Sequence, residues 1–318
     1  MLVCYSPFPL TASMGYIYDI SICRGEHRIV VKKVSPQAIG AQSFGDRRKA
    51  FSYQVEASFY EKFAATLIEK GLSIPTPFHV ERGHGEEITI CMSKLEGRPG
   101  DLGDNEEVRE VLRWMATLHA ATWGEKADIM VAGGLQPVGG YWHLDTRPDE
   151  HAAMPRRGWE GRLKRAARAI DARLKRDRMQ CCVHGDAKEA NMIWSTALNG
   201  GARVSMYDFQ YCGKAPPTVD LAYFLCVAAG CGHDDDHVRF YHRELMERLP
   251  PDVERPSLSE FLDSLSLAFC DFQRFMSGWG NWGCDLSTEV TSVLDRLDGG
   301  KDLGSEDAYD EAVMREFG

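Results

Sequence analysis

The sequence predicts an α+β protein with two lobes, a small N-terminal lobe built on an antiparallel sheet and a larger, mostly helical C-terminal lobe. Two early segments, 16–23 and 27–34, alternate between apolar and polar residues as strands do, and Gly25 between them suits a hairpin turn. After a segment rich in glycine and proline at 95–100, apolar residues recur at helical spacing instead. We therefore expect the lobes to comprise residues 1–95 and 96–318.

Further elements follow from local patterns within each lobe. Val55, Phe59 and Phe63 recur every four residues before Gly71, which predicts a helix over about 51–70. Strands are expected at 78–81, 87–92, 192–195 and 204–207, and helices near 108–118, at 156–178, from Leu221 onward, and at 258–276. The tail from Asp298 is acidic and weakly patterned.

Composition excludes several classes of protein. The 318 residues carry a formal net charge of −10, which makes nucleic acid and anionic membranes poor default partners. No segment reaches the roughly 18 uninterrupted apolar residues of a membrane span, and no secretory signal is evident. The ten cysteines form no CxxC pair, so free thiols in a reducing cytoplasm are expected. The oligomeric state stays open.

Three other patterns have an ordinary structural interpretation. The basic helix at 156–178 places its apolar residues on one face, so its charges are expected to form a solvated face and not a nucleic-acid site. The His- and Asp-rich segment 232–237 reads as a loop and a capped helix start. Trp279, Asn281 and Trp282 either pack a helix end, which we favour, or line an acceptor site for quaternary ammonium groups.

The segment 182–191 carries the clearest chemical signal. His184, Gly185 and Asp186 follow an apolar approach, four residues separate Asp186 from Asn191, and Asp208 ends the second of two predicted strands. Phosphoryl transfer needs a carboxylate to accept the proton of the acceptor hydroxyl, and oxygen ligands that hold Mg²⁺ against the phosphates. We therefore predict Asp186 as the base and Asn191 and Asp208 as the magnesium ligands.

This spacing resembles the catalytic loop of kinases. Gly185 stands where protein kinases have arginine, and Gln210 replaces the glycine of Asp-Phe-Gly. The pattern is therefore more similar to the aminoglycoside phosphotransferase and choline kinase group. Segment 220–225 and Leu118-His119-Ala120 followed by Trp123 look most like its ecdysteroid-kinase-like branch. The resemblance covers most of the chain, is specific at 182–194, 207–225 and 29–60, and implies a bilobal protein-kinase-like fold.

The resemblance also implies companions in the small lobe. It aligns Lys32 with the lysine that grips the α- and β-phosphates, and Glu56 with the partner that fixes this lysine by an ion pair. Strand alternation places Lys32 and Lys33 on opposite faces. Taken alone, both lysines would be solvated charges on a strand, and Glu56 an exposed helix residue.

The remaining implied contacts surround the nucleotide. Ser13 and Gly15 fall where a phosphate-covering loop is expected, although the segment is neither GxGxxG nor a Walker loop. The backbone of Ser93 and Leu95 is expected to meet adenine. His184 and Asp220 are expected to brace the loop that carries Asp186 rather than to react.

The sequence thus favours an ATP- and Mg²⁺-dependent phosphotransferase that acts on a hydroxyl group of a small molecule. A catalytically silent nucleotide-binding module is the alternative. A protein kinase is disfavoured, because His-Arg-Asp, Asp-Phe-Gly and a later Ala-Pro-Glu are all missing. The acceptor stays open among sterols, choline-like amines, aminoglycosides, macrolides and sugars, and so does the choice between ATP and GTP.

Overall fold

The computed structural model describes residues 3–4, 8–9, 14–22, 27–35, 44–84, 87–197, 200–280 and 282–318. Its N-terminal part is a six-stranded antiparallel sheet with the order β1-β3-β4-β6-β5, in which β2 also pairs with β3. The strands are β1 (Val3–Cys4), β2 (Phe8–Pro9), β3 (Gly15–Ile22), β4 (His27–Val34), β5 (Pro77–Arg82) and β6 (Ile88–Ser93). The predicted turn at Gly25 lies outside the described residues.

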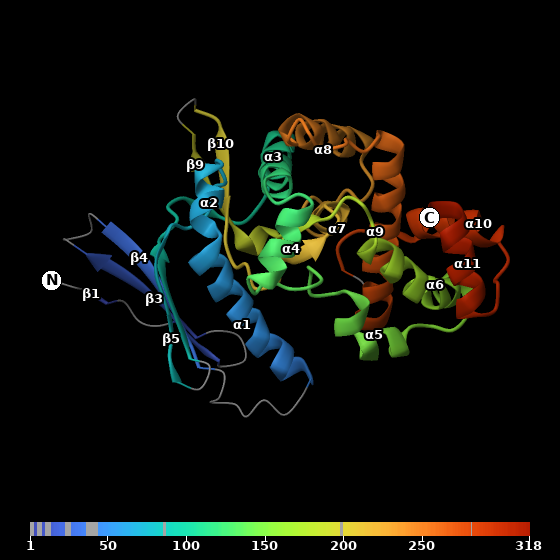
Figure 1. Cartoon of the computed structure of the whole chain (residues 1–318), viewed down its shortest axis with the longest axis horizontal. Coiled ribbons are helices and arrows are strands. Elements are labelled where there is room, and N and C mark those ends of the chain that lie inside the picture. The colour runs from blue at the N-terminus through green and yellow to red at the C-terminus, as the bar shows by residue number, and fades with distance from the viewer. Residues whose placement is uncertain are drawn as a thin grey trace.

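Two consecutive helices, α1 (Phe44–Lys62) and α2 (Ala64–Glu69), lie between this sheet and the rest of the molecule (Figure 1). The prediction that the helix begins near residue 51 is wrong, because α1 starts at Phe44. Its first turns are polar and carry no apolar repeat, so periodicity could not reveal them. Arg48 and Lys49 in these turns instead contact the other lobe, at Thr146 and Gln210.

The C-terminal part is mostly helical, as predicted (Figure 1). It contains two small antiparallel sheets, β7-β9-β10 and β8-β11. The helices are α3 (Asn105–Ala121), α4 (Glu125–Ala132), α5 (Pro148–Ala153), α6 (Gly158–Lys175), α7 (Thr218–Val227), α8 (Asp235–Arg248), α9 (Leu258–Trp279), α10 (Ser287–Asp298) and α11 (Glu306–Phe317). The strands are β7 (Arg98–Pro99), β8 (Cys181–Val183), β9 (Met192–Thr196), β10 (Ala202–Met206) and β11 (Gly213–Ala215), and short 3₁₀ turns are η5 (Leu144–Thr146) and η6 (Glu189–Asn191).

The acidic tail corrects one expectation. Residues 306–317 form α11, which packs with α10 against the basic helix α6 (Figure 1). Arg162 of α6 donates from Nε to Asp298 Oδ2 at 2.7 Å, and Arg165 pairs with Asp302. The basic face of α6 is therefore not a solvated face, because much of its charge is matched by acidic residues of the tail.

The two parts share a continuous apolar core that includes residues of both. The rings of Phe59 in α1 and Phe209 stack with centroids 3.7 Å apart, and the Ser73 and Ser205 hydroxyls are 2.7 Å apart. Within the described ranges, no helix is long and apolar enough to cross a membrane, and the eight cysteines from Cys91 to Cys284 are all free. The site described next lies where these two parts meet.

Candidate functional site

Asp220 at the start of α7 holds the loop that follows β8. Its carboxylate accepts hydrogen bonds from the backbone N–H groups of His184, at 2.6 Å, and Gly185, at 2.9 Å. It is fully buried and also lies 3.2 Å from His119 Nε2. Burial alone would raise the pKa of Asp220, but the His119 hydrogen bond and the nearby donors hold it below its ordinary value.

His184 links this loop to the strand hairpin beside it. Its Nδ1 accepts from the backbone N–H of Asp186 at 3.3 Å, and its Nε2 lies 3.0 Å from the carbonyl oxygen of Tyr207. The ring is therefore protonated on Nε2. Its Nδ1 must accept the Asp186 N–H, and its Nε2 must donate to the Tyr207 carbonyl oxygen, which can only accept. His184 thus ties the position of Asp186 to the residue that precedes Asp208.

Asp186 itself is buried and held from three sides. Its Oδ1 accepts from the Tyr223 hydroxyl at 2.9 Å, and its Oδ2 accepts from Asn191 Nδ2 at 3.1 Å. Lys188 Nζ lies 2.9 Å from the same Oδ2. Nδ2 of Asn191 also donates to the backbone carbonyl of Asp186 at 2.9 Å, so the amide oxygen of Asn191 is the atom left to face a ligand.

The β9–β10 hairpin brings Asn191 and Asp208 together. Met192 pairs with Met206 in its register, and the Tyr207 N–H donates to the Asn191 carbonyl oxygen at 3.1 Å. Asp208 is the one described residue other than glycine with a positive φ, at 69°. Its Oδ1 is buried and has no hydrogen-bond partner. A strained backbone and a buried carboxylate oxygen without a hydrogen bond at one position indicate a ligand site.

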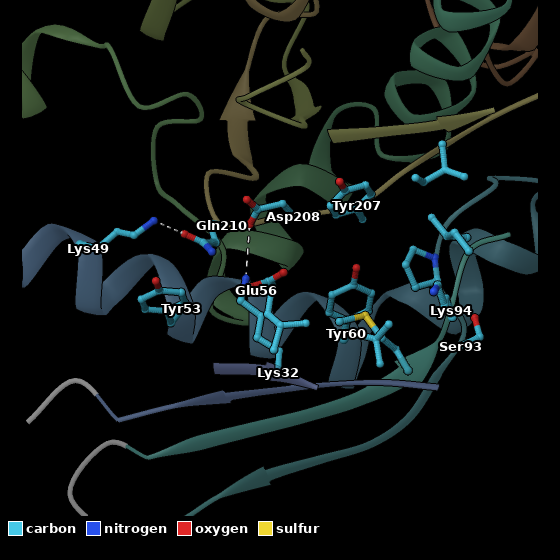
Figure 2. Close-up of a pocket in the computed structure, with 16 residues that line it drawn as sticks. Lys32, Lys49, Tyr53, Glu56, Tyr60, Ser93, Lys94, Tyr207, Asp208 and Gln210 are labelled. Carbon is cyan, nitrogen blue, oxygen red and sulfur yellow. Dashed lines mark hydrogen bonds and ion pairs between the residues drawn. The ribbon is translucent and has the colours of Figure 1, made fainter. Parts of the chain in front are cut away.

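Lys32 on β4 reaches across the cleft between the lobes (Figure 2). Its Nζ lies 2.5 Å from Glu56 Oε2 and 3.5 Å from Asp208 Oδ1. Burial opposes a positive charge here, but these two carboxylates outweigh it and raise the pKa of Lys32 above its ordinary value. The alternatives in which Lys32 and Glu56 are solvated surface charges are wrong, since both are buried.

The cleft has a volume of about 470 Å³, and its lining includes Ser93 and Leu95 as well as Lys32, Glu56 and Asp208 (Figure 2). Gly15 lies in β3 opposite Val34, where a Cβ atom would come within 2.0 Å of the Lys33 carbonyl oxygen. Close strand pairing therefore accounts for this glycine by itself, and a contact of Gly15 with phosphate stays a prediction. Ser13 lies outside the described residues.

Sequence reasoning missed two residues that the cleft brings together. Lys49 of α1 donates to Gln210 Oε1 at 2.7 Å, and its Nζ lies 5.0 Å from the ring centroid of Tyr53 (Figure 2). Burial lowers the pKa of Lys49. Gln210 replaces the glycine that follows Asp-Phe in kinases, and this unusual residue was the one signal in the sequence that the position matters. The contact between Gln210 and Lys49 could not be inferred, because the local sequence around each residue says nothing about the other.

The donors present fit a magnesium ion held partly by phosphates. Among the residues that the structure describes, no three His, Cys, Asp or Glu side chains are grouped to hold a metal alone. Mg²⁺ commonly takes only one or two protein ligands and completes its shell with water and phosphate oxygens. Asp208 Oδ1, which accepts no hydrogen bond, and the amide oxygen of Asn191 match that donor set.

Segment 232–237 has its predicted form, whereas the two tryptophans differ: Trp282 is partly buried against the core and Trp279 is 60% exposed. Asp234 caps α8 by accepting from the His237 N–H at 2.9 Å, which confirms a capped helix start in the His- and Asp-rich segment. Trp282 packs with its ring centroid 6.1 Å from that of Tyr223, which itself contacts Asp186. Asn281 lies outside the described residues.

Comparison with known proteins agrees with this geometry. The model of the phosphotransferase enzyme family matches residues 44–251. The chain belongs to this family. The predicted group, that of aminoglycoside phosphotransferases and choline-type kinases, and the predicted enzyme class, a small-molecule phosphotransferase, are thereby confirmed. No curated protein is significantly similar to the chain in sequence.

Several solved structures share the fold of this phosphotransferase. A microcompartment-associated aminopropanol kinase is 15% identical with a TM-score of 0.56, over 98% of this chain and 93% of that one. An ethanolamine kinase of Plasmodium vivax is 9% identical with a TM-score of 0.55, over 92% and 81%. The GDP complex of an aminoglycoside 2'-phosphotransferase-IIIa is 13% identical with a TM-score of 0.53, over 99% and 93%. At these identities the likeness confirms the predicted bilobal kinase-like fold and nothing finer.

Proposed function

We propose that this phosphotransferase moves the γ-phosphate of ATP to a hydroxyl group of a small molecule. The observation that carries the proposal is a continuous set of contacts around the cleft. Asp186 contacts Asn191, Asn191 bonds to the backbone next to Asp208, and Asp208 contacts Lys32. Phosphoryl transfer relies on positioning and charge, and this set supplies a carboxylate, two oxygen donors for a metal and a cation.

In this mechanism Asp186 accepts the proton of the acceptor hydroxyl. Tyr223 and Asn191 hold its two carboxylate oxygens, so the base keeps one orientation as the acceptor enters. Lys32 binds the α- and β-phosphates, and Glu56 fixes the lysine at 2.5 Å. Asn191 and Asp208 would hold Mg²⁺, which neutralises charge on the phosphates when it is bound.

A comparison of Asp186→Asn with the unchanged enzyme tests the proposal. We expect turnover of an accepted alcohol to fall at least about 100-fold, because a positioned base contributes this much. Nucleotide affinity should stay within about twofold, since no phosphate ligand is removed. Release of ADP over a panel of alcohol-bearing metabolites and antibiotics measures turnover, and calorimetry measures nucleotide binding.

Two outcomes would contradict the proposal in different ways. Near-normal turnover by a folded Asp186→Asn variant would exclude Asp186 as the base. Mg-ATP binding without ADP release for any alcohol would favour the silent nucleotide-binding module. GTP belongs in the same panel, because the sequence leaves the donor nucleotide open and one structural relative was solved with GDP.

A further inference from the structure

A run of aromatic rings leads away from Asp186. The Tyr223 hydroxyl donates to Asp186 Oδ1 and lies 3.4 Å from the Tyr141 hydroxyl. The ring centroid of Tyr141 is 5.8 Å from that of Phe275, which is in turn 5.8 Å from that of Trp279. If Asp186 is the base, the acceptor hydroxyl lies beside it, so the body of the acceptor meets these rings.

The guanidinium of Arg147 occupies the centre of this aromatic group. It lies 5.3 Å from the ring centroid of Tyr141, 5.0 Å from that of Phe275 and 5.2 Å from that of Trp279. Several aromatic faces around one point form the arrangement that binds quaternary ammonium groups. We call Tyr141, Phe275 and Trp279 the aromatic cage. In this protein the guanidinium of Arg147 already fills the cage.

Two polar contacts fix Arg147 in place. Its Nε donates to the carbonyl oxygen of Tyr141 at 2.9 Å, and its Nη1 donates to Glu150 Oε1 at 3.0 Å. Arg147 is only 8% exposed. Movement out of the cage would leave the Glu150 carboxylate without its ion pair in a poorly solvated place, which is unfavourable.

A second cation stands next to the first. Arg48 of α1 donates from Nη1 to the carbonyl oxygen of Thr146, the residue before Arg147. Among the described residues, no carboxylate oxygen comes within ion-pair distance of Arg48, whereas Glu150 pairs with Arg147. This side of the site therefore carries surplus positive charge, although the whole chain has a net charge of −10. Like charges disfavour the approach of another cation.

We propose that Arg147 is a specificity-determining residue that excludes acceptors carrying an ammonium group, and that the acceptor is an uncharged or acidic hydroxyl compound with an apolar face. The proposal rests on the proposed function, which places the acceptor next to Asp186. It sets this chain apart from two structural relatives, which are named as kinases of aminopropanol and ethanolamine.

Binding of tetramethylammonium tests the cage without any turnover. Trp279 is a 60% exposed member of the cage, so its fluorescence can report occupancy, and calorimetry gives the affinity. We expect no saturable binding to the unchanged enzyme or to Arg147→Lys, which keeps a cation in place. Arg147→Met removes the charge and leaves Glu150 facing the cage, so affinity should rise at least about tenfold.

Further variants separate this effect from general loosening of the structure. The double change Arg147→Met with Glu150→Gln should lose most of the gain, because the carboxylate that attracts the ammonium group is gone. Thermal unfolding checks that each variant is folded. Saturable binding to the unchanged enzyme at the affinity of Arg147→Met would overturn the proposal, and so would a folded Arg147→Met protein that gains nothing.

A matched pair of alcohols extends the test to acceptors. Choline and its uncharged carbon analogue dimethylbutanol differ in charge and hardly in shape. We expect the uncharged alcohol to bind at least about tenfold more tightly to the unchanged enzyme, and Arg147→Met to reverse this order. Preference of the unchanged enzyme for choline would overturn the proposal. If no alcohol in the wider panel yields ADP, the proposed function fails, while the ammonium result still decides the role of Arg147.

Discussion

The two adjacent lysines of β4 differ in which face of the strand carries them. Lys32 is 5% exposed and contacts Glu56, whereas Lys33 is exposed. We expect Lys32→Met to lower kcat/KM by about 100-fold, since the proposed phosphate site loses its preorganised cation. It should also cost about 3 kcal/mol of stability, because Glu56 stays buried without its partner.

Lys33→Met is the matched control for this change. Lys33 lies next to Lys32, and its replacement removes the same charge. This change should alter stability by less than about 0.5 kcal/mol and leave kcat/KM within about twofold. Steady-state kinetics and urea unfolding of both variants provide the measurements. Equal effects of the two changes would show that net charge, and not the position of Lys32, matters.

Asp220 provides a prediction about pH. Its pKa is lower in the folded protein than its ordinary value near 4. Such a carboxyl stabilises the fold above that ordinary value, and the contribution is lost as pH falls through the lowered pKa. Asp220→Asn should therefore lower the free energy of unfolding by about 3 kcal/mol at neutral pH. Below about pH 4 the free energy of unfolding of the variant should fall less steeply with pH than that of the unchanged protein.

Urea unfolding at neutral pH and at several pH values below about 4 measures the effect of Asp220→Asn. The exposed Asp252→Asn is the control and should leave the pH profile unchanged. Turnover of Asp220→Asn should fall as well, because the N–H groups of His184 and Gly185 lose the charged acceptor that holds the loop. A pH profile identical to that of the unchanged protein would contradict the role of Asp220.

The proximity of site residues was predictable where the residues are close in sequence. Asp186 and Asn191 lie on one loop and Asp208 ends the adjoining hairpin, so spacing alone indicated that they meet. The contacts of Lys49 with Gln210 and of Arg147 with the aromatic cage join segments far apart in the chain. Hydrophobic periodicity shows which face of an element is buried, but not what lies across a cleft from it.

The contact between helix α6 and the acidic tail depends on one arginine more than the others. The side chain of Arg162 is 13% exposed, and its Nη2 lies 2.5 Å from an oxygen of the fully buried Asp298 carboxylate. Arg168 on the same helix pairs with Glu306 at 3.1 Å, but both side chains are largely exposed. Arg162→Met should lower the free energy of unfolding by about 3 kcal/mol, because the buried Asp298 carboxylate loses its ion pair.

Arg168→Met is the control for Arg162→Met and should cost less than about 0.5 kcal/mol, because exposed pairs are screened by water and salt. Chemical unfolding of the two variants gives the comparison. A loss of similar size in both would mean that the tail is held by overall charge attraction and not by the buried Arg162–Asp298 pair.

Elements were predictable in proportion to how much of their pattern is local. Strand β4 occupies its predicted bounds, because alternation along eight residues is a complete signal for a strand. Helix α11 was missed because its apolar repeat is short, with Tyr309, Ala312, Val313 and Phe317 as its buried face among exposed charged residues.

At the scale of the whole molecule, the two lobes do not have separate interiors. Phe59 of the first part stacks on Phe209 of the second at 3.7 Å, and Trp114 Nε1 donates to the Ser73 carbonyl oxygen at 2.9 Å. The boundary between the lobes at residue 95 therefore stays a prediction. The shared core implies that the lobes depend on each other for stability.

We therefore expect a single calorimetric transition for the full chain, even though it has two lobes. A fragment of residues 1–95 should not fold alone, because it would expose the apolar face of α1. Mg-ATP at about 100 times its dissociation constant should add about 2.7 kcal/mol to the free energy of unfolding and keep the transition single. Asp208→Asn should lose the part of this gain that depends on magnesium, whereas Asp252→Asn should keep it. Two transitions, with only the first shifted by nucleotide, would instead show that the lobes unfold independently and that the cleft joins two separate domains.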